Sequence, residues 1–228
     1  MGLWVTGLFR YLAVVRLLNW MRRSFALSIT LVLLAGCGRE RPKAASARTL
    51  YHGATLTPPQ PAPDFTLTAT DGRPYHFKAE TKDYVALLFF GYTHCPDVCP
   101  VHMANLAAVL DRLPIGVAGS IKVVFVTVDP ARDTPRVLRT WLDKFNPTFV
   151  GLRGTLDEVN RVQGLFHMPS TAVERLPQGG YVVGHGAAVI GIVGDSVRVL
   201  YPFGIRQADW MEDLPQLVAA IPRAHQTD

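Results

Sequence analysis

Two cysteines, Cys95 and Cys99, stand in the stretch FFGYTHCPDVCP, where an apolar run gives way to prolines. Such a pair can form a structural disulfide, act as a redox dithiol or supply two ligands to a metal ion. A disulfide between residues so close in sequence would constrain the unfolded chain little, so we favour the other two roles. Dithiol oxidoreductases usually carry two residues between their cysteines, whereas three stand here: Pro96, Asp97 and Val98.

A third ligand would distinguish a metal site from a redox site. Two thiolates and one imidazole suit copper(I), because soft sulfur ligands select that ion, although zinc is also admissible at these donors. His185 is the best candidate among seven histidines, since it precedes a predicted buried strand and lies between Gly184 and Gly186. Glycines on both sides allow a loop to approach another backbone closely.

The other six histidines are weaker candidates. His94 adjoins Cys95, but the turn can aim its ring elsewhere. His102 follows Cys99 by one helical turn and is expected on the helix surface or as a hydrogen-bond donor behind the ligands. The remaining four are expected to be exposed or to lie in loops: His52, His76, His167 and His225.

The predicted elements place the cysteines at the end of a buried strand. Residues 84–90 and 121–128 are apolar runs of strand length, which predicts strands buried on both faces. A helix with one apolar face is predicted over residues 98–113. The pair therefore lies at the carboxyl end of a strand, where open α/β sheets hold their sites. Because a helix N-terminus favours the thiolate, both cysteines are expected to have lowered pKa values.

Six further patterns complete an α/β domain. They are a hairpin over 64–77 around Asp71-Gly72, a helix from Pro135 capped by Asp133 or Thr134, a short strand over 148–151, a helix from a Thr155/Glu158 capping box to near Phe166, a hairpin of 187–193 and 197–201, and a helix around 208–220 that Pro215 can kink. This order predicts a thioredoxin-like fold, with a central mixed β-sheet flanked by helices and an added N-terminal β-hairpin.

The N-terminal region has the layout of a secretory signal. Two arginines follow Met21, then an apolar stretch that ends in Leu-Ala-Gly before Cys37, a sequence that resembles the lipobox of bacterial lipoproteins. We expect residues 1–36 to be an extension and signal peptide with its true start at Met21. Cys37 would then carry lipid and anchor the protein to a membrane of the bacterial cell envelope, on its periplasmic or extracytoplasmic side.

Composition sets the rest of the organisation. Residues 37–63, rich in Arg, Ala, Thr and Pro, are expected to form the lipidated cysteine and a flexible spacer. Residues 64–222 are expected to form one copper-binding domain, and residues 223–228 a tail. Four of the 23 basic residues and none of the 18 acidic ones precede Cys37, so the remaining chain is almost neutral. With no basic stripe of interleaved aromatics, no nucleic-acid surface is expected.

Four motifs in order, GYTHCPDVCP, VTVDPARDTP, FVGLRGTLDEVNRVQGLF and a histidine ahead of AAVIGIVGDSVRVLYPFG, resemble the Sco/SenC copper proteins. The resemblance runs from about Pro63 to Ile221. It implies a thioredoxin-like fold and one copper ion per monomer, held by Cys95, Cys99 and His185. It also implies a metallochaperone for the copper A centre of cytochrome c oxidase, with oxidase subunit II and other copper chaperones as partners.

One departure concerns the residues beside the histidine. Many members of that family have Asp before it and Ser or Thr after it, where Gly184 and Gly186 stand here. A partner that orients the imidazole would then have to come from elsewhere.

Two enzymatic alternatives remain open. The dithiol could reduce the cysteines of the oxidase copper site as a thiol-disulfide reductase. PDFTLTATDG also resembles the opening of peroxiredoxin-like peroxidases, but Thr93 stands two residues before Cys95 instead of the usual three.

Three polar residues are expected near the site. Asp97 could fix the loop through hydrogen bonds to the backbone, tune the charge of the site or contact a partner. Alternatively, it is only a turn residue with an Asx-type hydrogen bond. Asp129 and Arg132 follow the second buried strand and could form a docking edge.

Overall fold

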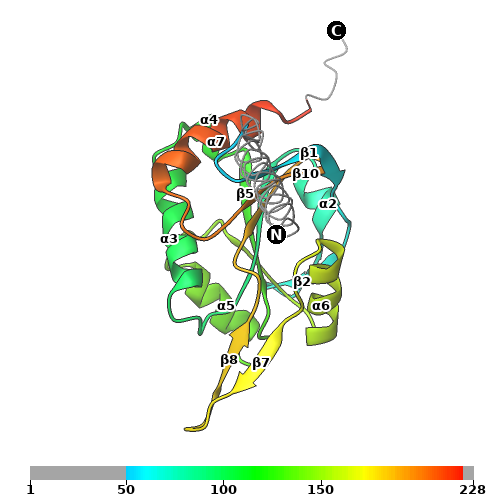
Figure 1. Cartoon of the computed structure of the whole chain (residues 1–228), viewed down its shortest axis with the longest axis vertical. Helices are drawn as coiled ribbons and strands as arrows, with labels where there is room; N and C mark the ends of the chain where they lie inside the picture. The colour runs from blue at the N-terminus through cyan, green and yellow to red at the C-terminus, as the bar shows by residue number, and fades with distance from the viewer. Residues whose placement is uncertain (1–49, 223–228) are drawn as a thin grey trace, which may run out of the picture. The chain divides into compact units, whose positions relative to one another are not determined.

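The computed structural model describes residues 50–222. An eight-stranded mixed sheet with the order β1-β10-β9-β4-β5-β6-β2-β3 lies between two layers of helices (Figure 1). At its centre β4 (Val85–Gly91) runs parallel to β5 (Ile121–Thr127), which runs parallel to β6 (Val150–Arg153). Every residue of β4 is buried, as the continuous apolar run predicts for a strand covered on both faces. The predicted thioredoxin-like fold is confirmed.

The long helices follow the expected signals. α3 (Val98–Leu110) links β4 to β5, and α5 (Pro135–Leu142) links β5 to β6. Thr134 caps α5 through its side chain, with Pro135 in the first turn. α6 (Leu156–Leu165) begins with the predicted capping box. Figure 1 shows α3 and α5 on one side of the sheet and α6 on the other. The shared side of α3 and α5 is what right-handed crossovers between the parallel strands β4, β5 and β6 require.

Both predicted hairpins are present. β2 (Thr66–Ala69) pairs with β3 (Pro74–His76), and Gly72 takes a positive φ of 86° in the turn. β9 (Val189–Val193) pairs with β10 (Ser196–Tyr201) and also with β4, antiparallel in each case. The chain then forms α7 (Gln207–Ala219), which includes Pro215. Two short helices were not predicted: α2 (Phe77–Thr81) and α4 (Ile115–Ala118).

The prediction of a flexible spacer up to residue 63 is wrong for its last part. Residues 54–61 form β1 (Ala54–Pro61), which pairs antiparallel with β10 at the edge of the sheet. The register shifts between Thr55 and Gln60, which takes Pro58 and Pro59 out of the regular ladder. Proline lacks a backbone donor and is tolerated at such edges and bulges, so a proline-rich sequence did not exclude a strand.

A second small sheet was also missed. β7 (Ala172–Arg175) and β8 (Tyr181–Gly184) pair antiparallel with each other and with no other strand of the described chain. Figure 1 shows this hairpin extending away from the main sheet. In its two strands Val183 is the only buried residue. Strands that are exposed on both faces need no alternation of apolar and polar residues, so no strand signal is present in the sequence here. Within residues 50–222, no helix combines the length and the apolar character needed to cross a bilayer.

Candidate metal centre

The end of β4 and the start of α3 position the two cysteines. The chain leaves β4 at Gly91, and Cys95 lies in the loop just before the helix. Asp97 caps α3, because its carboxylate accepts a hydrogen bond of 2.6 Å from the Val98 N–H. The N–H of Cys99, in the first turn, points at the Cys95 sulfur at 3.4 Å. An N–H that has no partner within the helix thus holds the first thiol beside the second.

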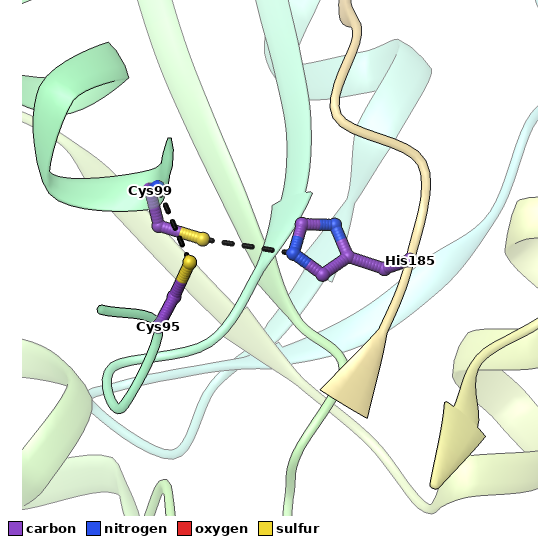
Figure 2. Close-up of side chains that lie close together, drawn as sticks. All are labelled: Cys95, Cys99 and His185. Carbon is purple, nitrogen blue, oxygen red and sulfur yellow. Dashed lines mark hydrogen bonds between the residues drawn. The ribbon is translucent and has the colours of Figure 1, made fainter. Parts of the chain in front are cut away.

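His185 completes the cluster from the opposite side. It follows β8 directly, and its Nε2 lies 3.7 Å from the Cys99 sulfur (Figure 2). The ligand atoms of Cys95, Cys99 and His185 all lie within 4.8 Å of one another. The ring packs edge-on against Tyr92, with centroids 5.7 Å apart. Two sulfurs and one imidazole nitrogen are therefore already gathered around one point.

The tautomer of His185 suits a ligand role. Its Nδ1 lies 2.9 Å from the Gly186 carbonyl oxygen, an acceptor that requires a proton on Nδ1. The lone pair of Nε2 is then free and faces the sulfurs. The carbonyl of Gly186 thus orients the imidazole. An Asp or a Ser/Thr beside the histidine could have taken this role, but Gly184 and Gly186 stand at those positions here.

Burial dominates the electrostatics of the site. It lowers the pKa of His185, which keeps the imidazole neutral, and the Gly186 carbonyl opposes this shift. Burial also raises the pKa of the Cys99 thiol, and the neighbouring Cys95 adds to the increase. The expectation of a lowered pKa is therefore wrong for Cys99, because desolvation outweighs the backbone hydrogen bond with Tyr92, which lowers the pKa. A bound cation would favour the thiolate again.

The glycines beside His185 differ from each other. A Cβ at Gly184 would meet Ala172 at an ordinary 3.7 Å, whereas a Cβ at Gly186 would lie 2.5 Å from Met168 Cε. The predicted close approach thus occurs at Gly186 alone, and it involves a side chain instead of a backbone.

His102 lies behind the site and is buried, which excludes the predicted helix-surface role and leaves the donor role. Its Nε2 lies 3.0 Å from the Ala187 carbonyl oxygen, so it donates to the segment just after His185. Its ring also packs on Phe89, 4.9 Å away between centroids. Burial of His102 could have been predicted from the sequence, because it lies one turn before Leu106 and therefore on the same, apolar face of α3.

The remaining described histidines lie outside the cluster. His94 is exposed and contacts Thr93, whereas His76 contacts Thr66 across its hairpin. His167 lies in a loop with a φ of 56°. His52 is exposed, as expected, but it is not without contacts, because its Nδ1 and backbone N–H both lie 2.8 Å from the carboxylate of the buried Asp213. Cys37 and His225 lie outside the described residues.

Asp129 and Arg132 pair with each other on the same rim as the cysteines. Asp129 is only 4% exposed and also accepts a hydrogen bond of 2.8 Å from the Tyr181 hydroxyl. The predicted docking edge is therefore wrong for Asp129, whose carboxylate is turned to its own chain. Sequence reasoning missed Tyr181, since nothing in its pattern distinguishes it from a strand residue.

Comparison with known proteins gives a family match over most of this chain. A family model described as SCO1/SenC matches residues 54–218. The mitochondrial protein SCO2 of Saccharomyces cerevisiae is 35% identical over 147 residues, which cover 64% of this chain and 47% of that protein. The chain thus spans about half the length of this relative.

Two solved structures are similar over most of the described chain. The apo Sco1 protein of Thermus thermophilus has 33% identity and a TM-score of 0.66, covering 75% of this chain and 99% of that one. The ScoI structure of Bradyrhizobium japonicum with copper bound has 28% identity and a TM-score of 0.62, covering 69% and 99%. Because the family model matches residues 54–218, which are most of this chain, the chain belongs to the SCO1/SenC family.

Proposed function

We propose that this protein is a membrane-tethered copper metallochaperone that assists assembly of the copper A centre of cytochrome c oxidase, with subunit II as its partner. The gathering of Cys95, Cys99 and His185 within 4.8 Å supports this most directly. A related structure from Bradyrhizobium japonicum holds copper. One copper ion per monomer is the expected cargo.

The donor set fits a soft ion that must be passed on. Two sulfurs and an imidazole favour copper(I) over hard cations. Cys99 is buried and His185 half-buried, while Cys95 is partly exposed. An incoming thiolate could therefore reach the ion from the Cys95 side and replace the ligands one at a time. Uptake by two thiols releases two protons, so copper affinity should fall as pH falls.

Copper(I) titration of the full chain in detergent, in competition with a chromophoric chelator, tests the ligand set. His185→Ala should weaken copper binding at least about a hundredfold, because one of three ligands is lost. His94→Ala is the matched control, since His94 adjoins Cys95 but lies outside the cluster. Equal affinity in wild type and His185→Ala would refute the ligand set.

A thiol-disulfide reductase is the second candidate. Both cysteines are free, and Cys95 is the more exposed. Its thiolate would attack a partner's disulfide, and Cys99 would resolve the mixed disulfide, so that the partner is reduced and this pair is oxidised. His185→Ala should leave this exchange largely intact while it abolishes tight copper binding, which separates the two activities.

The tether is proposed from the sequence alone. Leu34-Ala35-Gly36-Cys37 supports lipidation at Cys37 and a place on the bacterial cell envelope. Metabolic labelling with a fatty acid tests it: label should enter the wild type and be absent from Cys37→Ser. Label in both proteins would exclude Cys37 as the lipid site.

A further inference from the structure

The position of His185 depends on how the β7–β8 hairpin is held. His185 follows the last residue of β8, and residues 185–188 have no regular structure. The two hairpin strands pair with no other strand in residues 50–222. All of β7 is exposed, and Val183 alone is buried in β8. Because so little apolar surface is covered, hydrophobic packing alone holds this hairpin weakly.

Polar contacts from the loop between β5 and α5 hold β8 instead. The Tyr181 hydroxyl donates to Asp129 Oδ1 at 2.8 Å. The Arg132 guanidinium lies over the Tyr181 ring, 3.8 Å from its centroid, and Nη1 donates to the Tyr181 carbonyl at 3.3 Å. Asp129 in turn accepts a hydrogen bond from Arg132 Nε. One tyrosine is thus fixed through its hydroxyl, its ring face and its carbonyl.

Fixed points lie on both sides of His185 in the chain. Tyr181 lies four residues before it, at the other end of the short strand β8. Ala187 lies two residues after it, and its carbonyl accepts a hydrogen bond from the buried His102. Arg132 also lies 5.8 Å from the centroid of Tyr92, whose ring contacts His185. Loss of the Tyr181 contacts would free the chain before His185, whereas the hydrogen bond from His102 to Ala187 would still fix the chain after it.

We infer that Asp129, Arg132 and Tyr181 form a clamp that holds His185 against the cysteine pair and so sets how long copper is retained. This inference rests on the proposed function. The three residues are positioning residues, since the structure brings none of them into the Cys95/Cys99/His185 cluster.

Tyr181→Phe removes the hydroxyl and keeps the ring under Arg132. In the full chain in detergent, we expect a chelator to withdraw copper(I) at least about ten times faster than from wild type, as expected for losing a hydrogen bond to a carboxylate. Tyr75→Phe is the matched control, because the buried Tyr75 hydroxyl on β3 has no hydrogen-bond partner within residues 50–222. It should leave the withdrawal rate unchanged.

A spectroscopic measurement separates positioning from general stability. In the copper(II)-loaded protein, nitrogen hyperfine coupling from the imidazole should weaken in Tyr181→Phe and persist in Tyr75→Phe. Arg132→Lys, which keeps a charge beside Asp129 but loses the planar stack, should shift both measurements in the same direction. It also serves as the second variant should Tyr181→Phe fold poorly.

His185→Ala distinguishes the two proposals. If it releases copper rapidly while Tyr181→Phe and Arg132→Lys behave as Tyr75→Phe, the clamp is wrong and the ligand set stands. If His185→Ala retains copper as wild type does, the ligand set fails and the clamp's role fails with it.

Discussion

At the scale of single residues, the two cysteines of the centre differ in their surroundings. Cys99 is wholly buried in the first turn of α3, whereas Cys95 is partly exposed in the preceding loop. Burial raises the pKa of the Cys99 thiol. Thiolates are the reactive species, so the exposed sulfur should react first with any incoming thiol, metal or alkylating agent.

Iodoacetamide at neutral pH should therefore modify Cys95 before Cys99 in the reduced, metal-free protein. We expect at least a tenfold difference in rate, because the reagent reaches Cys99 only through local opening. Peptide mass spectrometry after timed quenching measures both rates. Equal rates would mean that the buried position of Cys99 is not maintained in solution.

Much of the site can be predicted from the sequence. Cys95 and Cys99 follow the buried strand β4, and His185 precedes β9, which pairs antiparallel with β4, so the end of one strand lies beside the start of the other. The donor role of His102 was one of two predicted for it, but its acceptor, the Ala187 carbonyl, could not be predicted. The contribution of Tyr181 was missed, because its contact with Asp129 joins residues 52 positions apart and local pattern carries no signal for such a pair.

At the scale of elements, the end of β4 fixes where the cysteine loop begins. Gly91 is its last residue, and a Cβ there would lie 2.7 Å from a Phe89 ring atom and 2.9 Å from Phe125. Both rings are completely buried and cannot move aside as a flexible side chain could. The close approach of aromatic rings therefore requires glycine at this strand end.

Gly91→Ala should reduce the free energy of unfolding by about 1–3 kcal/mol through overpacking. Gly184→Ala is the control, because its Cβ would meet nothing closer than 3.7 Å, and it should change stability by about 0.5 kcal/mol or less. Urea denaturation of the metal-free variants measures both values. Similar losses in the two variants would show that crowding at Gly91 is relieved elsewhere.

Elements with strong local signals were predictable, and those that depend on context were not. Apolar runs and caps predicted β4, β5, α5 and α6 within a few residues. β1 was missed because its prolines indicate a spacer, yet β10 offers an edge on which a proline-rich strand can pair. β7 and β8 were missed because exposed strands lack apolar alternation.

At the scale of the whole molecule, a cluster of polar contacts around His52 joins the first described residues to the last helix, α7. The His52 ring and backbone N–H both contact Asp213, which lies buried on α7 and also accepts a hydrogen bond from Tyr201. Asp209 and Glu212 face the other ring nitrogen of His52 at 3.8 and 3.6 Å. The segment leading into β1 is thus fastened to the domain by a titratable group.

The hydrogen bond to Asp213 raises the pKa of His52 in the folded protein, against a smaller opposing effect of desolvation. A histidine whose pKa is raised on folding contributes stability that is complete below its unfolded value, about 6.5, and is lost as pH rises through the folded value. His52→Ala should therefore lower the melting temperature most below about pH 6 and progressively less at alkaline pH.

Thermal unfolding of the metal-free protein from pH 5 to 9 measures this dependence, and metal-free samples remove the separate effect of pH on copper binding. His76→Ala is a matched control, since His76 is exposed and contacts the neutral Thr66. If the His52→Ala difference varies with pH no more than the His76→Ala difference does, the protonated imidazole does not fasten the N-terminal segment. The neutral hydrogen bonds to Asp213 must then suffice to hold β1 at the sheet edge.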